Sequence, residues 1–288
     1  MEYDHVIAYQ QFDEERALYH LENTQVSDCV FAGEKDGESL LKETRHVSVE
    51  NCRFSLRYPL WHAQHFELKS STLDELTRAP IWYSRHGLID HCTITGIKIL
   101  RECSDIDVKD CQIDSPEFGW YSHDIRVRDC QINSEYIFLN TDDVKADGLR
   151  FSGKYSFQYM HRVEITNSYL DTKDAFWHSE DVVVKDSVLK GEYLAWFSKN
   201  LTLINCQIIG TQPFCYCENL KLINCEMIDT DLAFEYSDVE ADVKGHIVSV
   251  KNPKSGKIVA DSVGEIIFED AIMDVTGQIV IRDEKKEA

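Results

Sequence analysis

Two carboxylates and an arginine near the middle of the chain are of the types that perform acid–base chemistry. Arg101 directly precedes Glu102, Glu117 follows in the next segment, and Trp82 and Trp120 each lie 19 residues from Arg101. Two carboxyl groups can share the work of protonating a leaving group and activating a nucleophile, as in glycoside cleavage. We therefore take Arg101, Glu102 and Glu117 as the candidate catalytic residues of a carbohydrate-active enzyme.

Aromatic side chains recur at the same 19-residue spacing and form two neighbouring columns. Neighbouring residues of a strand point to opposite faces, so one column should be at least partly exposed beside the charged residues that precede it. Exposed rings next to charges are the composition of a sugar-binding surface, and large exposed apolar patches usually serve an interaction. The expected substrate-binding residues are Arg57, Tyr58, Trp61, His62, Arg78, Trp82, Tyr83, Trp120, Tyr121, Lys173, Asp174, Trp177 and His178.

A second interpretation of the same columns needs no ligand. Large rings can simply fill a wide coil and stack on one another, and opposite charges can pair between neighbouring strands. The face could also serve as a surface for homo-oligomerisation or as a scaffold. These alternatives stay open from the sequence.

Acidic residues precede several of the expected strands, at Asp105, Asp124, 142–143 and 180–181, with His123 and His161 among them. Stacked carboxylates could hold calcium, but only if they line a concave site, and acidic turns are more commonly just solvated. Cys215 and Cys217 offer too few ligands for zinc. We expect no metal ion and no cofactor.

The elements that must position these residues follow from an internal repeat. The equivalents of Cys111 recur every 19 residues, at Cys130, Leu149, Ser168, Ser187, Cys206 and Cys225. A fixed period of this length indicates a solenoid, in which each coil buries its apolar face against the next. Apolar and polar residues alternate before the cysteine position, as in a strand with one buried face.

The alternation slips at the residue before the cysteine, which indicates a bend. Asp and Asn favour such positions because they tolerate left-handed backbone. The bend residues are Asp28, Asn51, His91, Asp110, Asp129, Gly148, Asn167, Asp186, Asn205 and Asn224, and they should form an internal ladder of turns. The cysteine after the bend should point inward as a small buried hydrophobe, so we expect free thiols.

The fold predicted is all-β: a single-stranded, right-handed parallel β-helix of about eleven coils, because parallel crossovers favour the right hand. Coils should occupy residues 20–238 of one domain, 1–288. Residues 1–19, with a short helix at 13–19, should cap the first coil, and short strands in 239–288 should cap the last.

The net charge of −21 excludes a nucleic-acid-binding role, which requires a basic face. It also favours a neutral or weakly charged saccharide over a polyanion. No apolar run is long enough for a signal peptide or a membrane span, so we expect a cytoplasmic protein without membrane contact.

Several phrases resemble a bacterial family of uncharacterised β-helix proteins within the pectin-lyase-like superfamily. They are GESLLKE (37–43), YPLWH (58–62), GKYSFQ (153–158), DTKDAFWH (171–178), GTQPFCY (210–216) and SVKNP (249–253). The family brings no catalytic residues, whereas the superfamily implies lyases and hydrolases acting in a groove beside the coils. Two functions remain: a carbohydrate-active enzyme and a non-catalytic saccharide-binding or scaffold protein. An enzyme would need a concave site that holds two carboxylates, or a carboxylate and a base.

Overall fold

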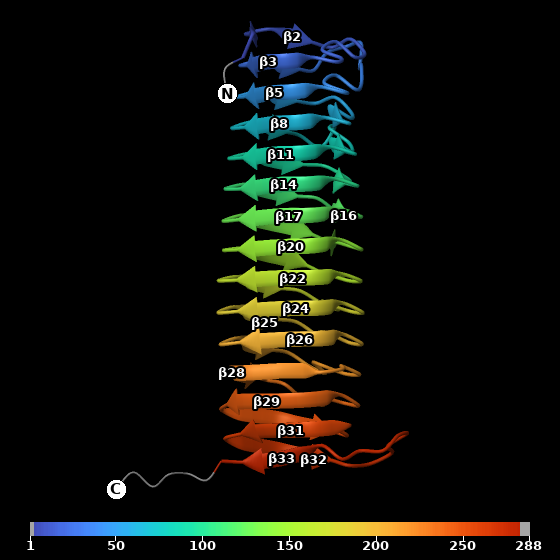
Figure 1. Ribbon diagram of the computed structural model, residues 1–288, viewed down its shortest axis with the longest axis vertical. Helices are drawn as coiled ribbons and strands as arrows, with labels where there is room; N and C mark the ends of the chain where they lie inside the picture. The colour runs from blue at the N-terminus through green and yellow to red at the C-terminus, as the bar shows by residue number, and fades with distance from the viewer. Residues whose placement is uncertain (1–2, 283–288) are drawn as a thin grey trace, which may run out of the picture. The chain divides into compact units, whose positions relative to one another are not determined.

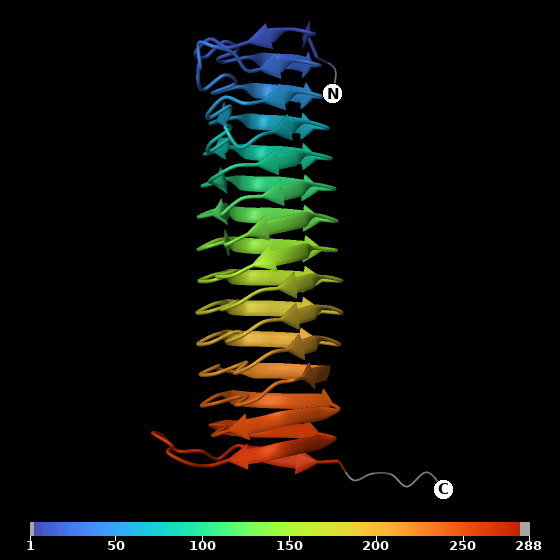
Figure 2. The same ribbon diagram turned by 180° about the vertical axis from the view of Figure 1, so that it is seen from behind.

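The computed structural model describes residues 3–282, which form β-strands and the turns that join them. The chain divides into two compact units, residues 1–150 and 151–288. In each unit the nearer strands run leftward as the chain descends, and the chain then returns behind them, which is a right-handed winding (Figures 1 and 2). The predicted parallel β-helix is therefore confirmed, while the expectation of a single domain stays a prediction.

The first unit contains three ladders of parallel strands. The longest strands are β1 (His5–Ala8), β3 (Glu22–Ser27), β5 (Arg45–Glu50), β8 (Gln64–Lys69), β11 (Arg85–Asp90), β14 (Ser104–Lys109), β17 (His123–Arg128) and β20 (Asp142–Asp147). A second ladder contains β2 (Gln11–Phe12), β4 (Val30–Phe31), β6 (Arg53–Phe54), β9 (Thr72–Leu73), β12 (Thr93–Thr95), β15 (Gln112–Asp114) and β18 (Gln131–Ser134). The third contains β7 (Leu60–Trp61), β10 (Ile81–Trp82), β13 (Ile99–Arg101), β16 (Glu117–Trp120) and β19 (Tyr136–Ile137).

The second unit repeats the first two ladders. Its long strands are β22 (His161–Thr166), β24 (Glu180–Lys185), β26 (Lys199–Ile204), β28 (Leu220–Ile228), β29 (Asp238–Lys244), β31 (Ser255–Ala260) and β33 (Gln278–Ile281). The others are β21 (Arg150–Gly153), which begins at the unit boundary, β23 (Tyr169–Asp171), β25 (Val188–Lys190), β27 (Gln207–Ile209), β30 (His246–Lys251) and β32 (Ser262–Ile267).

The register of the ladders reproduces the sequence period. Ile106 of β14 faces Ile125 of β17, which in turn faces Val144 of β20. Equivalent residues therefore stack directly over one another, and each column of the repeat becomes a physical row of side chains. This register fixes where each candidate site residue lies, because residues that are 19 apart in the sequence lie next to each other in neighbouring coils.

The core consists of the apolar residues that alternate along the strands. One apolar column of the 19-residue repeat is fully buried throughout: Leu41, Leu60, Ile81, Leu100, Phe138, Phe157, Phe176 and Phe214. All ten cysteines are buried and unbridged, and the seven that follow a bend residue point inward as predicted. Burial raises the pKa of the Cys103 thiol to about 12, so that side chain behaves as a small apolar group.

The predicted bend residues adopt left-handed backbone, with φ of 53° at Asn51, 50° at Asp186 and 54° at Asn205. Their side chains, however, are exposed or only partly buried and do not point into the interior. There they form ladders of their own, because the Asn205 amide donates to Asp186 and the Asn224 amide donates to Asn205. The ladder expected to be internal is thus an external one, since the left-handed residue turns its side chain outward.

A second outward ladder occupies the second residue of the long strands. The Asn200 amide donates to Asp181, and the Asn219 amide donates to Asn200, over 2.8 and 2.9 Å. These residues also have positive φ. Short polar side chains that bond to the next coil therefore occupy two of the several left-handed positions of a coil.

The ends of the chain differ from the prediction. Residues 13–19 contain turns and no helix, and β1 pairs in parallel with β3 as a further coil. Beyond residue 238, β31 pairs in parallel with β29, and β33 pairs with β31. The parts of the expected caps that the structure describes therefore continue the β-helix, and there are more coils than the eleven predicted. Residues 1–2 and 283–288 of those caps lie outside the described residues.

Among residues 3–282 the structure contains no helix of the length and apolar character needed to cross a membrane.

Candidate functional site

The tryptophans of this column are half-buried. They lie in the third ladder of the first unit and at the equivalent repeat positions of the second unit. Each indole N–H donates to a main-chain carbonyl of the following coil: Trp61 to Ala79, Trp82 to Lys98, Trp120 to Tyr136, Trp177 to Tyr193 and Trp196 to Gln212, over 2.7 to 2.9 Å. The indoles are thus fixed against the next coil. Their polar atom is already satisfied and is not directed toward a ligand.

The tryptophan rings stack on one another within each unit. The ring centroids of Trp61 and Trp82 lie 5.3 Å apart with an interplanar angle of 2°. Trp177 and Trp196 lie 5.4 Å apart at 7°. Because two stacked rings cover each other's faces, these pairs do not offer the space between them to a sugar ring. This geometry matches the interpretation in which rings stack along the column.

The column is interrupted at Arg101, which occupies the position of a tryptophan. Its guanidinium carbon lies 5.1 Å from the ring centre of Trp82, 5.9 Å from that of Trp120 and 5.1 Å from that of Tyr121. Its Nε atom is buried without a hydrogen bond and lies 3.6 Å from a carboxylate oxygen of Glu102. Arg101 is therefore held by cation–π contacts, while 27% of its side chain stays exposed.

Beside Arg101 the surface of the first unit is hollowed, with a volume of about 420 Å³. The lining residues come from β11, β13, β14 and β17 and from the turns beside them: Arg85, Arg101, Glu102, Cys103, Ser104, Tyr121 and His123. Cys103 and Ser104 are buried, whereas Tyr121 is 45% exposed. The hollow thus presents one exposed ring, two guanidinium groups, a carboxylate and an imidazole, all of which can contact a polar ligand.

Three of the residues predicted from the sequence meet in this hollow: Arg101, Glu102 and Tyr121. Glu117 does not line it. In the register of β13 and β16, Arg101 faces Trp120 and Ile99 faces Phe118. Glu117 therefore lies at the far end of its strand, on the order of 10 Å along the strand direction from Glu102.

The remaining predicted residues have other partners. Trp61 contacts the tilted ring of Tyr58, and His62 stacks with the exposed Tyr83. Arg57 pairs with Asp36 and Glu38. Arg78 is exposed at the surface of the first unit.

The predicted residues of the second unit form a separate set. Lys173 pairs with Glu192 at 3.0 Å, and Asp174 is buried beside it. His178 stacks between Tyr159 and Phe197 with ring centroids 5.0 Å apart on both sides. As in the first unit, ring faces are taken up by neighbouring rings.

Sequence reasoning missed Arg85 and Ser104, and it considered His123 only beside the acidic turns. They occupy one column of the repeat, the first position of the long strands, and the register aligns Arg85 with Ser104 and Ser104 with His123. The 19-residue step from Arg85 would have found them. They were overlooked because the search followed aromatic residues, and this column contains none.

Among the acidic residues before the strands, Asp105 and Asp124 are neutralised by an arginine side chain. Arg126 donates to Asp107 and Asp124 over 2.7 Å and also contacts Asp105. Hydrogen bonds from His86 and Arg126 hold the pKa of Asp105 below its usual range. These carboxylates are therefore bound within the protein.

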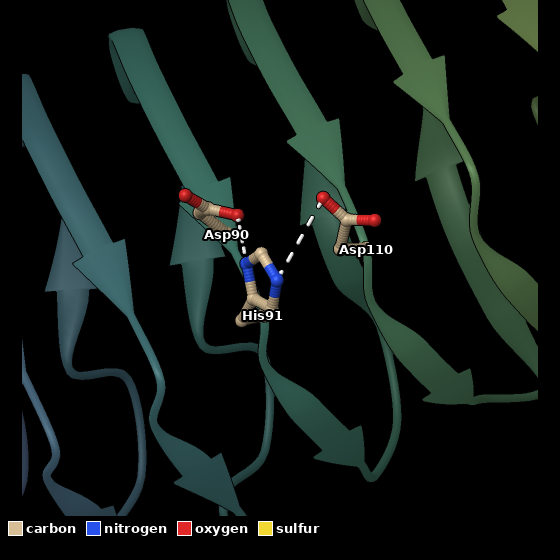
Figure 3. A group of neighbouring side chains, drawn as sticks. All are labelled: Asp90, His91 and Asp110. Carbon is tan, nitrogen blue, oxygen red and sulfur yellow. Dashed lines mark hydrogen bonds and ion pairs between the residues drawn. The ribbon is translucent and has the colours of Figure 1, made fainter.

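One group of metal-ligand residue types occurs at the end of β11 (Figure 3). The His91 Nδ1 atom lies 2.5 Å from Asp90, and its Nε2 atom lies 3.9 Å from Asp110. Lys109 reaches the other oxygen of Asp90 at 3.0 Å. The ammonium group supplies the positive charge that a metal ion would otherwise bring, so this group is explained by its own ion pairs.

The fold is similar to that of several solved structures at low sequence identity. A surface adhesin of Streptococcus pneumoniae, PfbA, matches with a TM-score of 0.55 at 10% identity over 87% of this chain and 83% of that chain. The tailspike protein of Escherichia coli bacteriophage HK620, in complex with a pentasaccharide, matches with a TM-score of 0.49 at 10% identity over 91% and 60%. The A-module of the Azotobacter vinelandii mannuronan C-5 epimerase AlgE6 gives 0.47 at 10% over 96% and 86%.

At these identities the likeness concerns the fold alone. None of the curated proteins matches the chain. The family resemblance seen in the sequence is nevertheless shown, because one family model spans nearly all of the chain. Residues 5–281 match the family described as "Protein of unknown function (DUF3737)", and the chain belongs to that family.

Proposed function

We propose that this protein binds a saccharide in the hollow beside Arg101. The observation that carries the proposal is an arginine held between two indoles of the column, beside which the surface is open and lined by polar groups. In the pairs Trp61–Trp82 and Trp177–Trp196, by contrast, the rings cover each other's faces.

The chemistry of the hollow suits a polyhydroxylated ligand. Tyr121 offers an exposed ring edge and hydroxyl, and 43% of the Glu102 side chain is exposed as an acceptor for sugar hydroxyl groups. Arg85 and Arg101 supply planar donors that can bond two oxygens at once. Because Arg101 is already fixed between Trp82 and Trp120, little side-chain entropy is lost when it bonds a ligand.

Binding is better supported than turnover. The carboxylate pair expected for glycoside cleavage is not assembled, since Glu117 does not line the hollow. Glu102 and His123 both line it and are the residue types of an acid and a base. We therefore propose saccharide binding as the function and treat cleavage as a second question for the same experiment.

The proposal is tested by screening a glycan panel by thermal shift and measuring the dissociation constants of the hits. Tyr121→Ala should weaken binding roughly 5- to 150-fold, because it removes a large contact of about 1–3 kcal/mol. Tyr159→Ala is the matched control, since Tyr159 is also 45% exposed but lies in the second unit. It should leave affinity unchanged.

A broad panel that gives no shift would overturn the proposal, and so would equal losses in the two tyrosine variants. Hits should then be assayed for product formation with the unmodified protein and with Glu102→Gln. Turnover that disappears in Glu102→Gln would make the protein an enzyme, whereas binding without turnover would leave it a binder.

A further inference from the structure

Three histidines form a continuous column in the first unit. His46 of β5, His65 of β8 and His86 of β11 each occupy the second position of their strand and are exposed. The ring centroids lie 4.7 Å apart between His46 and His65 and 4.5 Å apart between His65 and His86. The interplanar angles are 4° and 13°, so the three imidazoles are nearly parallel.

The fold requires a left-handed residue at this position, but it does not require histidine. The same strand position in other coils is taken by Asn23, Asp105 and Asp124 in the first unit and by Asp181 and Asn200 in the second, all with positive φ. Three successive histidines in place of Asn or Asp therefore add a chemical group, the imidazole, that the backbone does not need.

The last histidine of the column is oriented as metal-binding histidines usually are. The His86 Nδ1 atom lies 2.6 Å from a carboxylate oxygen of Asp105. Because an ionised carboxylate can only accept, Nδ1 carries the proton and the Nε2 lone pair is left available. Histidine ligands almost always donate their other N–H to a carboxylate or carbonyl in this way.

The central histidine, His65, stacks with both of its neighbours and so belongs to both adjacent pairs. A hollow of about 230 Å³ adjoins this residue and is lined by His65, Phe66, Glu67, His86, Gly87, Leu88, Asp105 and Asp107. Its three carboxylates are already ion-paired within the protein, Asp105 and Asp107 with Arg126 and Glu67 with Lys69.

One ion can be shared by two adjacent rings only if they turn out of their stack. Two imidazole nitrogens at about 2.0–2.1 Å from a tetrahedral zinc ion are roughly 3.3 Å apart, and each lone pair points at the ion. The ring centroids of His65 and His86 lie 4.5 Å apart with the planes 13° from parallel, so the two side chains must rotate until their lone pairs converge. Exposed rotamers make such a movement readily, and the remaining positions can be taken by water or by a carboxylate.

We propose that adjacent imidazoles of this histidine column bind a divalent transition-metal ion of the zinc, nickel or copper type, which are the ions that imidazole suits best. The proposal is independent of saccharide binding in the hollow beside Arg101. It does not extend to His91, whose nearest carboxylate already pairs with Lys109.

The arrangement of the three histidines allows an experiment that distinguishes the two adjacent pairs. His65 belongs to both adjacent pairs, so His65→Asn leaves His46 and His86 two coils apart and removes every pair. His46→Asn leaves the pair of His65 and His86. Asparagine suits the left-handed backbone and occupies the same strand position in other coils, so these variants should fold.

Binding of Zn²⁺, with Ni²⁺ and Cu²⁺ in parallel, is measured by titration calorimetry on the full chain without an affinity tag. We expect His65→Asn to weaken Zn²⁺ binding at least tenfold and His46→Asn to retain it within a few-fold. His91→Asn is the control, because asparagine also occupies the equivalent bend in other coils. It should bind as the unmodified protein does.

The absence of binding for all three ions would overturn the proposal. So would unchanged affinity in a His65→Asn variant whose circular dichroism and melting temperature are those of a folded protein. A loss of binding in His91→Asn alone would place the ion at Asp90, His91 and Asp110 and would equally contradict the histidine column.

Discussion

At the scale of single residues, the clearest conflict in the molecule is the buried carboxyl of Asp174. Burial raises its pKa, and the nearby Glu192 raises it further, while Lys173 opposes the shift. A carboxyl whose pKa is higher in the folded than in the unfolded state binds its proton more tightly when folded. Keeping it ionised at neutral pH therefore costs stability, and that cost disappears as the pH falls through the folded-state pKa.

Asp174→Asn should accordingly raise the melting temperature at pH 7, because the amide removes the charge and still tolerates the left-handed backbone, with φ of 53°. The gain should shrink as the pH is lowered and the native carboxyl becomes protonated. Scanning calorimetry at several pH values measures both effects. Asp171→Asn is the control, since exposed Asp171 pairs with Lys190 at 3.0 Å and should not be stabilised by the change. A stabilisation that does not vary with pH would contradict this explanation.

The thiols give a second prediction at the residue scale. All ten cysteines are buried and unbridged, and burial also raises the pKa of Cys217, to about 11. The reactive form of cysteine is the thiolate, and none of the ten buried side chains is open to a reagent in the folded protein. Ellman's reagent should label almost none of them in the native state and all ten after denaturation. Rapid labelling of the native protein, or fewer than ten thiols after denaturation without a reductant, would contradict the buried, reduced arrangement.

At the scale of the elements, the bend before the inward position determines how each coil turns. Asn205→Ala should destabilise the second unit, because alanine in left-handed backbone costs about 1–2 kcal/mol and the amide bonds to its neighbours are lost. Asn205→Gly loses the same bonds but carries little strain, so it should be the milder change by roughly that amount. Urea denaturation of the two variants measures the difference, and equal losses would mean that the backbone conformation contributes little.

The regular strands and turns could be predicted because the same 19-residue period determines the buried face of each strand and the position of its bend. The 19-residue step placed Ile106, Cys111 and Asn205 correctly, since alternation fixes which residues are inward and the slip fixes where the chain turns. The ends could not be predicted in this way. The paired residues of β29 and β31 are 17 apart and those of β31 and β33 are 21 apart, so parallel pairing continues there without the period.

The candidate site was predictable in part for the same reason. The step of the repeat brings Arg101, Glu102 and Tyr121 together, because they lie in adjacent columns of adjacent coils. It could not reveal that Trp61 and Trp82 would cover each other's faces, since ring rotation leaves no trace in residue spacing. The pairing of Glu102 with Glu117 failed because the two positions fall at opposite ends of neighbouring strands.

At the scale of the whole molecule, each coil is held by its neighbours and not by distant segments. Stability in such stacks is approximately a sum of coil and interface contributions. A core change should therefore act mainly on its own and the adjacent coils. Gly87→Ala illustrates this, because a β-carbon there would meet the ring of Phe66 at 2.3 Å and clash with the next coil as well.

Hydrogen exchange measured by mass spectrometry should show Gly87→Ala loosening chiefly β8, β11 and β14, with the second unit nearly unchanged. The expected loss of stability is about 1–3 kcal/mol, the usual result of overpacking a filled core. Uniform loosening of the whole chain would argue against neighbour-limited coupling.

In the two outward ladders of the second unit, the side-chain hydrogen bonds all run the same way along the stack of coils. In both of them an asparagine donates to an asparagine, which donates to an aspartate that can only accept. Spontaneous deamidation of a middle residue such as Asn205 would replace the only donor to Asp186 with a second negative charge. The ladder would then lose one hydrogen bond, and two negative charges would face each other. Chemical ageing of this protein should therefore begin at these turns. Mass spectrometry of stored protein would locate that damage long before the core is affected.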